Sequence, residues 1–60
     1  MKNGTKRTSD LSVLYVEGDL SLQKEVTLHL KKIFSNVYQA FNGLEGLSVY
    51  EKHKPDIVLT

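Results

Sequence analysis

Apolar residues occur along this chain in short runs separated by longer segments of mixed character. The first run, 11–16, is apolar, β-branched and aromatic, and it ends abruptly at Glu17. A run that is apolar on both faces is typical of a strand inside a parallel sheet. Similar runs occupy 36–40 and 56–60, so the pattern predicts three short strands.

The segment between the first two strands follows a helical period. Large apolar side chains recur three or four residues apart, at Leu22, Val26, Leu30, Ile33 and Phe34. This spacing predicts an amphipathic helix that ends before Ser35 and is capped by Asp19 or Ser21. The polar residues between the apolar positions are expected to face water, namely Gln23, Lys24, Glu25, Lys31 and Lys32.

The segment after the second strand has two interpretations. Asn42-Gly43 between apolar runs is a strong hairpin signal. The following residues do not alternate like a strand, however, because large side chains recur every third position, at Leu44, Leu47 and Tyr50. We therefore favour a second helix from about Gly43 to His53, with Asn42 as its cap.

Two residues shape this second helix. Gly46 lowers helix propensity by about 1 kcal/mol relative to alanine, so we expect it where the helix lies close against the sheet. Pro55 is expected to end the helix, because proline disfavours the helical conformation at the residue before it.

The order of these elements predicts an α/β fold. Strands alternating with helices at this spacing form βαβ units and a parallel sheet. Right-handed crossovers then give three parallel strands in order 2-1-3, with one helix on each face.

Composition divides the chain unevenly. Residues 1–10 contain one large apolar residue, Met1, and are predicted to be a disordered leader. The cationic side chains Lys2, Lys6 and Arg7 leave a basic arm as the alternative for this segment. Residues 11–60 carry five lysines and six acids, and form the predicted domain.

Several protein classes are disfavoured by composition. The chain has no cysteine, which excludes disulfides and thiol chemistry and favours a reducing, cytoplasmic setting. No apolar run approaches the roughly 20 residues of a membrane span. Eight Lys and Arg against seven Asp and Glu give no electrostatic case for nucleic-acid binding. Neither His29 nor His53 stands at metal-ligand or nucleophile spacing from a suitable partner, so catalysis is not expected of them.

Three segments, taken together, resemble a known family. Residues 13–19 read VLYVEGD, 40–47 read AFNGLEGL and 54–60 read KPDIVLT. In this order they resemble the first half of a response-regulator receiver domain, whose pattern is a strand with an acidic pair, then A-x-N-G-x-E-A-L, then P-D-I-V-L-x-D. The resemblance implies a truncated flavodoxin-like fold, whose complete sheet has the order 2-1-3-4-5.

The resemblance also implies a role in two-component signalling. The intact parent would accept a phosphoryl group from a histidine kinase or phosphotransfer protein, on an aspartate at the end of the third strand. That position falls immediately after Thr60, whereas Asp56 matches the aspartate at the strand's beginning. Phosphoryl transfer needs an in-line nucleophile and charge-neutralising cations. The chain as it stands is therefore predicted not to be phosphorylated and not to be an enzyme.

The acidic cluster departs from the family pattern. Two adjacent acids after the first strand hold Mg²⁺ in the family. Glu17 matches the first acid, Gly18 occupies the second position, usually the direct ligand, and Asp19 matches the frequent third acid. Loss of one carboxylate is expected to weaken Mg²⁺ binding, since this ion demands near-ideal oxygen coordination. Glu17 and Asp19 remain the candidate ligands, with two solvated carboxylates as the alternative.

The resemblance leaves one alternative function and one assembly prediction. A degenerate receiver half could serve as a phosphorylation-independent interaction module. In either case, 57–59 would form an apolar edge strand, which is a template for pairing with another chain. We therefore expect a homo-oligomer, most simply a twofold dimer, joined through the third strand or by exchange of elements between chains. A poorly ordered monomer is the alternative.

Overall fold

A parallel three-stranded sheet forms the centre of the computed structural model, which describes residues 7–60. Its strands are β1 (Ser12–Val16), β2 (Asn36–Ala40) and β3 (Ile57–Leu59), in the order β2-β1-β3. In the register of the sheet, Val13 of β1 lies between Val37 and Ile57. The predicted strand order and direction are confirmed.

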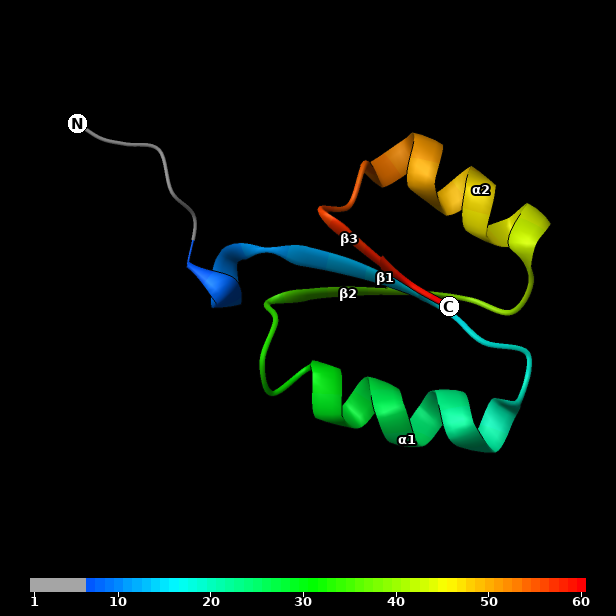
Figure 1. The fold of residues 1–60 in the computed structure, drawn as a ribbon, viewed down its shortest axis with the longest axis horizontal. Coiled ribbons are helices and arrows are strands. Elements are labelled where there is room, and N and C mark those ends of the chain that lie inside the picture. The colour runs from blue at the N-terminus through cyan, green and yellow to red at the C-terminus, as the bar shows by residue number, and fades with distance from the viewer. Residues whose placement is uncertain (1–6) are drawn as a thin grey trace.

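Two helices cover opposite faces of this sheet (Figure 1). Helix α1 (Leu20–Leu30) connects β1 to β2, and helix α2 (Gly43–His53) connects β2 to β3. The α/β fold class with one helix on each face is confirmed, and the hairpin interpretation of Asn42-Gly43 is wrong. Among residues 7–60, neither helix has the length and apolarity needed to cross a membrane.

The core lies on both sides of β1. Val13 and Tyr15 form one buried cluster with Leu30 of α1. On the other face, an added Cβ at Gly46 would lie 3.0 Å from a Val16 methyl group and 3.8 Å from the Ala40 methyl. This distance confirms that Gly46 allows α2 to lie close against the sheet.

The buried face of α1 differs from the predicted one. Gln23 was expected to face water, but only 2% of its surface is exposed, and Thr27 is also buried. Leu22 and Ile33, expected in the core, are each nearly half exposed. The physical reason is that the carbonyl oxygens of Glu17 and Ala40, at the carboxyl ends of β1 and β2, accept hydrogen bonds from Gln23. The side of α1 that carries Gln23 therefore packs against the sheet.

Helix α1 also ends earlier than predicted. It stops at Leu30, although Ile33 and Phe34 had been assigned to its apolar face. Lys32 and Ile33 donate their backbone N–H groups to acceptors three residues back, His29 and Leu30, which tightens the chain into a turn. Phe34 still packs against the core cluster from this turn.

Both helices begin at the predicted caps. The Asp19 side chain accepts a hydrogen bond from the Leu22 backbone N–H at 2.9 Å. Asn42 accepts from the Glu45 N–H at 2.8 Å, and the Glu45 carboxylate accepts in turn from the Phe41 N–H at 2.6 Å. The bonds to Asp19 and Asn42 satisfy N–H groups that the first helical turn leaves without acceptors, and the bond from Phe41 fastens the residue before the cap.

The described part of the predicted leader contains one short turn. Thr8–Asp10 form a short 3₁₀ helix, and the Ser9 carbonyl accepts hydrogen bonds from the backbone N–H and hydroxyl of Ser35. These two bonds join the turn to the α1–β2 connection, and the disordered leader stays a prediction. Residues 1–6, including Lys2 and Lys6 of the basic-arm alternative, lie outside the described residues.

Candidate functional site

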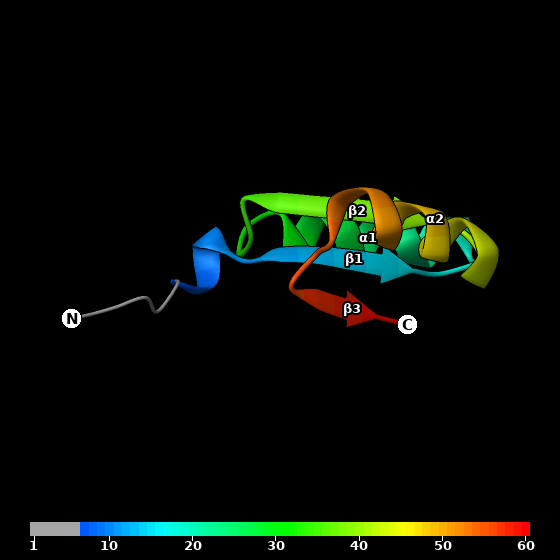
Figure 2. The ribbon, with the colours of Figure 1, turned by 90° about the horizontal axis from the view of Figure 1, so that it is seen from above.

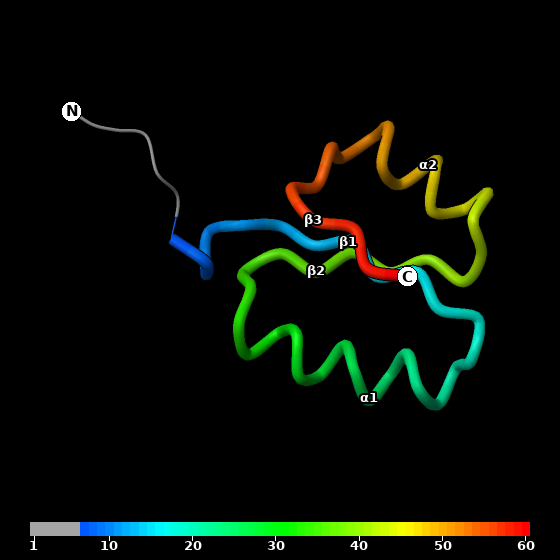
Figure 3. Tube along the Cα trace, in the orientation of Figure 1, coloured from blue at the N-terminus to red at the C-terminus, as the bar shows by residue number. Residues whose placement is uncertain are grey.

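The carboxyl ends of all three strands meet at one edge of the sheet (Figure 3). Glu17 follows β1, Phe41 follows β2, and Thr60 follows β3. Because α1 and α2 lie on opposite faces, the chain reverses its winding direction between β1 and β3. In open α/β sheets ligands bind at such a switch point, outside the carboxyl ends of the strands. This edge is therefore the candidate site.

Glu17 is half-buried at this edge and is held by local hydrogen bonds. Its Oε2 accepts from the Asp19 backbone N–H at 3.1 Å, and its Oε1 lies 3.5 Å from the Tyr15 hydroxyl, which donates to it. The carboxylate thus points toward the β1–α1 connection. It retains acceptor capacity, since an ionised carboxylate offers about four lone-pair positions.

Asp19 is exposed and has a structural role. Its Oδ1 caps α1 by accepting from the Leu22 N–H. The structure thus brings Glu17 and Asp19 to the same short connection, as the sequence predicted. Among residues 7–60, no group of three or more histidine, cysteine, aspartate or glutamate side chains is arranged to hold a metal ion. A metal-binding role for Glu17 and Asp19 stays a prediction.

Gly18 lies between these two acids in an exposed position. A Cβ added there would meet the Phe41 carbonyl oxygen at 3.5 Å, which is an ordinary van der Waals distance. The backbone at Gly18 therefore leaves room for a side chain, and a third carboxylate could be accommodated between Glu17 and Asp19.

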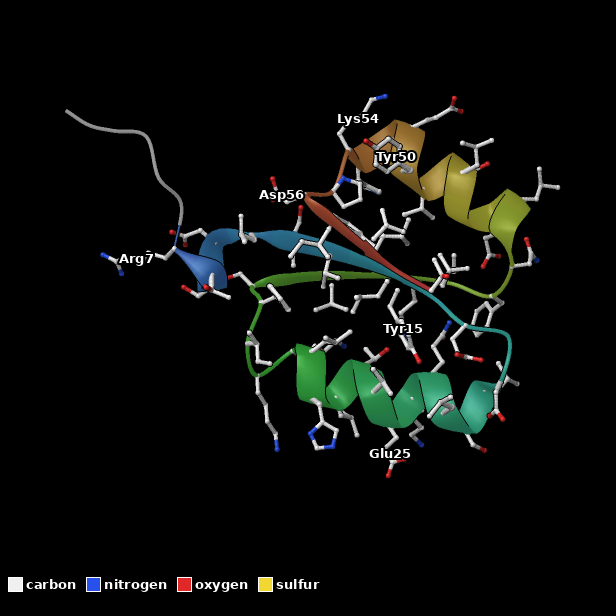
Figure 4. All side chains as sticks on the ribbon, in the orientation of Figure 1. Arg7, Tyr15, Glu25, Tyr50, Lys54 and Asp56 are labelled. Carbon is white, nitrogen blue, oxygen red and sulfur yellow. The ribbon has the colours of Figure 1, made fainter. Side chains whose placement is uncertain are left out.

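Asp56 lies at the opposite edge of the sheet, where β3 begins (Figure 4). Its Oδ2 accepts from the backbone N–H of Ser12 at 2.8 Å and from the Ser12 hydroxyl at 3.1 Å. The Asp56 N–H donates back to the Ser12 Oγ at 3.2 Å. These reciprocal bonds fasten the start of β3 to the start of β1, so the position of Asp56 matches the one inferred from its sequence context.

Tyr15 is a titratable group beside the candidate site. Burial raises the pKa of its phenol above the usual value of 10.0, and the nearby carboxylates of Glu17 and Asp19 raise this pKa further. Both effects disfavour the phenolate, the first by removing it from water and the second by charge repulsion. Tyr15 therefore stays neutral and donates its hydroxyl proton toward Glu17.

A polar network next to the site was not found from the sequence. The Gln23 side-chain Nε2 donates to the carbonyl oxygens of Glu17 at 3.1 Å and Ala40 at 2.8 Å. The Gln39 Nε2 donates to the Gln23 Oε1 and the Thr27 hydroxyl, both at 3.1 Å. The spacing of Gln23 and Thr27, four residues apart, was the available signal. This network joins α1 to the carboxyl ends of β1 and β2.

Tyr38, Tyr50 and His53 take part in ring contacts. The rings of Tyr38 and His53 stack with centroids 4.3 Å apart and an interplanar angle of 16°. The ammonium of Lys54 lies 5.4 Å from the centre of the Tyr50 ring. His29 is exposed on α1.

A shallow apolar groove opens beside the site on the α2 face. It has a volume of about 490 Å³, and its lining includes Val16, Leu47, Tyr50, Val58 and Thr60. The groove lies between α2 and β3, because α2 packs over β1 and β2 and β3 extends beyond it (Figure 2).

Comparison with known proteins adds no family to these observations. No protein-family model, curated protein or solved structure matches the chain. The findings identify the protein as a small α/β domain with a three-stranded parallel sheet in the order 2-1-3, the arrangement of one half of a flavodoxin-like fold.

Proposed function

We propose that residues 11–60 form the N-terminal half of a response-regulator receiver domain, which acts in a cytoplasmic two-component phosphorelay. The observation that carries this proposal is the presence of Glu17 and Asp19 at the carboxyl end of the central strand in a parallel 2-1-3 sheet. Both the topology and the position of the acids agree with the resemblance noted in the sequence, and the switch point beside them is where such a fold binds ligands.

The chemistry of this half limits what it does alone. Acceptance of a phosphoryl group requires a nucleophilic carboxylate at the site and cations around the transferred oxygens. The residue at the carboxyl end of β3 is Thr60, and Asp56 is bonded to Ser12 at the far edge. We therefore propose that the 60-residue chain takes no phosphoryl group. A histidine kinase or phosphotransfer protein is the proposed partner of an intact parent domain.

Intact-mass measurement tests this proposal. The chain is incubated with acetyl phosphate and Mg²⁺, beside an intact receiver domain as a positive control. We expect the phosphoryl adduct on the control alone. An adduct on this chain would overturn the proposal that it lacks a phosphoacceptor.

Sequencing the transcript that encodes the chain tests the family assignment. An aspartate codon directly after Thr60, followed by a segment of similar length with a late lysine, would support a receiver. A stop codon at that position would favour an interaction module that works without phosphorylation.

The interaction module is the second candidate function, and Gly18 is the observation that favours it. This residue stands where the family has its direct metal ligand, and the neighbouring carboxylates are engaged in local hydrogen bonds. A site that lacks this ligand is expected to hold Mg²⁺ weakly, which favours a function without phosphoryl chemistry.

Gly18→Asp tests whether this loop retains the geometry of a metal site. We expect Mg²⁺ to raise the midpoint temperature of thermal unfolding of Gly18→Asp. The reason is that the bound cation would neutralise the three adjacent carboxylates of this variant. The original chain and Gly18→Asn, the matched control without the added charge, should respond little. Equal responses of Gly18→Asp and Gly18→Asn would contradict a metal-site remnant.

A further inference from the structure

The pair Asn42-Gly43 carries a reactivity that its capping role does not use. An asparagine followed by glycine is especially prone to deamidation, because glycine has no Cβ to shield the backbone nitrogen that attacks the side-chain amide. Both residues are exposed, and no neighbouring atom lies within 4 Å of the place that a Cβ at Gly43 would take. The surroundings of Gly43 therefore leave room for the reaction.

The reaction forms a five-membered ring within the chain. The Gly43 backbone nitrogen bonds to the Asn42 Cγ, the Cγ–Nδ2 bond breaks, and Nδ2 leaves as ammonia together with the proton of the Gly43 nitrogen. Water then opens this succinimide ring. Addition of water at Cγ gives aspartate, whereas addition at the main-chain carbonyl carbon gives isoaspartate, in which the main chain passes through the former side chain.

The folded structure holds Asn42 away from the ring geometry. The ring requires the Gly43 nitrogen to be nearly eclipsed with the Asn42 Cβ, whereas the Asn42 ψ of 172° leaves the two staggered. The Asn42 Oδ1 accepts from the Glu45 N–H at 2.8 Å, and the Glu45 Oε1 accepts from the Phe41 N–H at 2.6 Å. These two bonds hold the Asn42 side chain and the backbone on either side of it.

We propose that Asn42 is a deamidation site whose rate is controlled by the first turn of α2. The residue reacts from the locally opened state, in which the two bonds at the helix start are broken. The stability of this turn therefore sets the fraction of molecules able to react. The inference does not depend on the proposed function.

Deamidation adds a negative charge beside the candidate site. The β1–α1 and β2–α2 connections lie side by side (Figure 1), and the Phe41 carbonyl oxygen is 3.5 Å from a Cβ built at Gly18. A carboxylate at position 42 thus joins Glu17 and Asp19 at the same edge of the sheet. The aspartate product can still cap α2, whereas isoaspartate lengthens the main chain by one carbon and disturbs the cap.

Peptide mapping of the folded chain at mildly alkaline pH tests control by the cap. Conversion at Asn42 is followed by tandem mass spectrometry in the original chain, Glu45→Ala and Glu45→Gln. We expect Glu45→Ala to accelerate conversion about 2- to 12-fold, which is the effect of one lost hydrogen bond on opening. Glu45→Gln is the matched control, because its side-chain oxygen can accept from the Phe41 N–H, and its rate should stay close to that of the original chain. Acceleration by both variants alike, or by neither, would overturn the proposed control.

The same measurement in urea tests the site itself, even if Glu45→Ala fails to fold. Unfolding removes the cap, so Asn42 of the original chain should convert at least several-fold faster than in the native state, at the rate of Glu45→Ala. Asn3-Gly4, the other such pair of the sequence, is the positive control in these digests. Conversion of Asn3 without conversion of Asn42 in urea, or equal native and urea rates at Asn42, would overturn the proposal.

Gly43→Ala tests whether the ring forms. Nothing obstructs a Cβ at this position, so the variant should fold, and its methyl group shields the attacking nitrogen. We expect conversion at Asn42 to be several-fold slower than in the original chain when both are in urea, and isoaspartate to accompany aspartate in the original chain. Equal rates in urea, or aspartate without isoaspartate, would contradict a succinimide intermediate.

Discussion

Lys54 is the residue that carries the clearest backbone strain. It ends α2 with φ 48° and ψ 57°, in the left-handed region, and is the one residue other than glycine in 7–60 with positive φ. Such a conformation costs an L-residue about 1–2 kcal/mol. Pro55 follows it and disfavours a further helical turn. The chain thus leaves α2 toward β3 through a strained position.

Lys54→Gly is expected to be more stable than Lys54→Ala. Glycine adopts this conformation without the Cβ penalty, so the free energy of unfolding should exceed that of Lys54→Ala by about 1 kcal/mol. The alanine variant is the matched control, since both variants lose the contact between the Lys54 ammonium and the Tyr50 ring. Urea denaturation measures the difference, and equal stabilities would contradict the strain argument.

Tyr15 predicts a dependence of stability on alkaline pH. Because its pKa is raised in the folded state, the folded protein holds the phenolic proton more tightly than the unfolded chain. Its contribution is complete below pH 10, the value of the unfolded residue, and is lost as pH rises through the folded pKa. Tyr15→Phe should abolish this loss of stability at alkaline pH, because phenylalanine has no titratable hydroxyl.

The measurement is the free energy of unfolding from pH 8 to 11 for three proteins. The original chain should lose stability above about pH 10 more steeply than Tyr15→Phe. Tyr50→Phe, a change at a partly exposed ring, should follow the original chain. A Tyr15→Phe curve parallel to that of the original chain would show that Tyr15 contributes no such pH dependence.

At the scale of elements, the packing of α1 depends on a buried amide. Gln23 donates to the Ala40 carbonyl at the end of β2 and to the Glu17 carbonyl just after β1, and it accepts from Gln39. One side chain thus ties α1 to the carboxyl ends of both strands. A buried polar group that loses its partner costs about 1–3 kcal/mol. The helix is thus positioned by hydrogen bonds as much as by apolar contact.

Gln23→Met separates these two contributions. Methionine keeps a similar volume but donates no hydrogen bond to the carbonyls of Glu17 and Ala40, so we expect a loss of about 1–3 kcal/mol. Lys24→Ala, at the neighbouring exposed position, should change stability by less than about 0.5 kcal/mol. Thermal and urea unfolding provide the comparison. Equal effects of the two variants would mean that the network adds no net stability.

For the whole molecule, the protection of backbone amides from hydrogen exchange should differ between strands. β1 pairs on both sides and contains Val13 and Leu14, which are buried, whereas β3 pairs on one side. Stability in a small domain is greatest where backbone hydrogen bonds and apolar contacts are most enclosed.

Hydrogen exchange tests this expectation residue by residue. Amides of 13–15 should exchange most slowly, and those of 57–59 faster, in dilute solution. Amides of 57–59 that are protected as well as those of 13–15 would contradict the uneven distribution of stability.

Features set by neighbouring residues were readable from the sequence. The helix caps at Asp19 and Asn42, the close approach at Gly46 and the parallel 2-1-3 sheet were predicted, because capping, helical period and crossover handedness depend on short stretches of chain. The position of Glu17 and Asp19 at one strand end followed for the same reason.

Features that join distant segments were decided by the tertiary structure alone. The burial of Gln23 requires the Ala40 carbonyl and the Gln39 side chain, which come from another element. The turn at 8–10 is joined to Ser35, twenty-six residues away from Ser9. A periodic pattern shows which residues share a helix face, but it does not show which polar groups of other elements contact that face. The rotation of α1 about its axis and the hydrogen bonds at the site therefore depend on how the strands are placed in the folded structure.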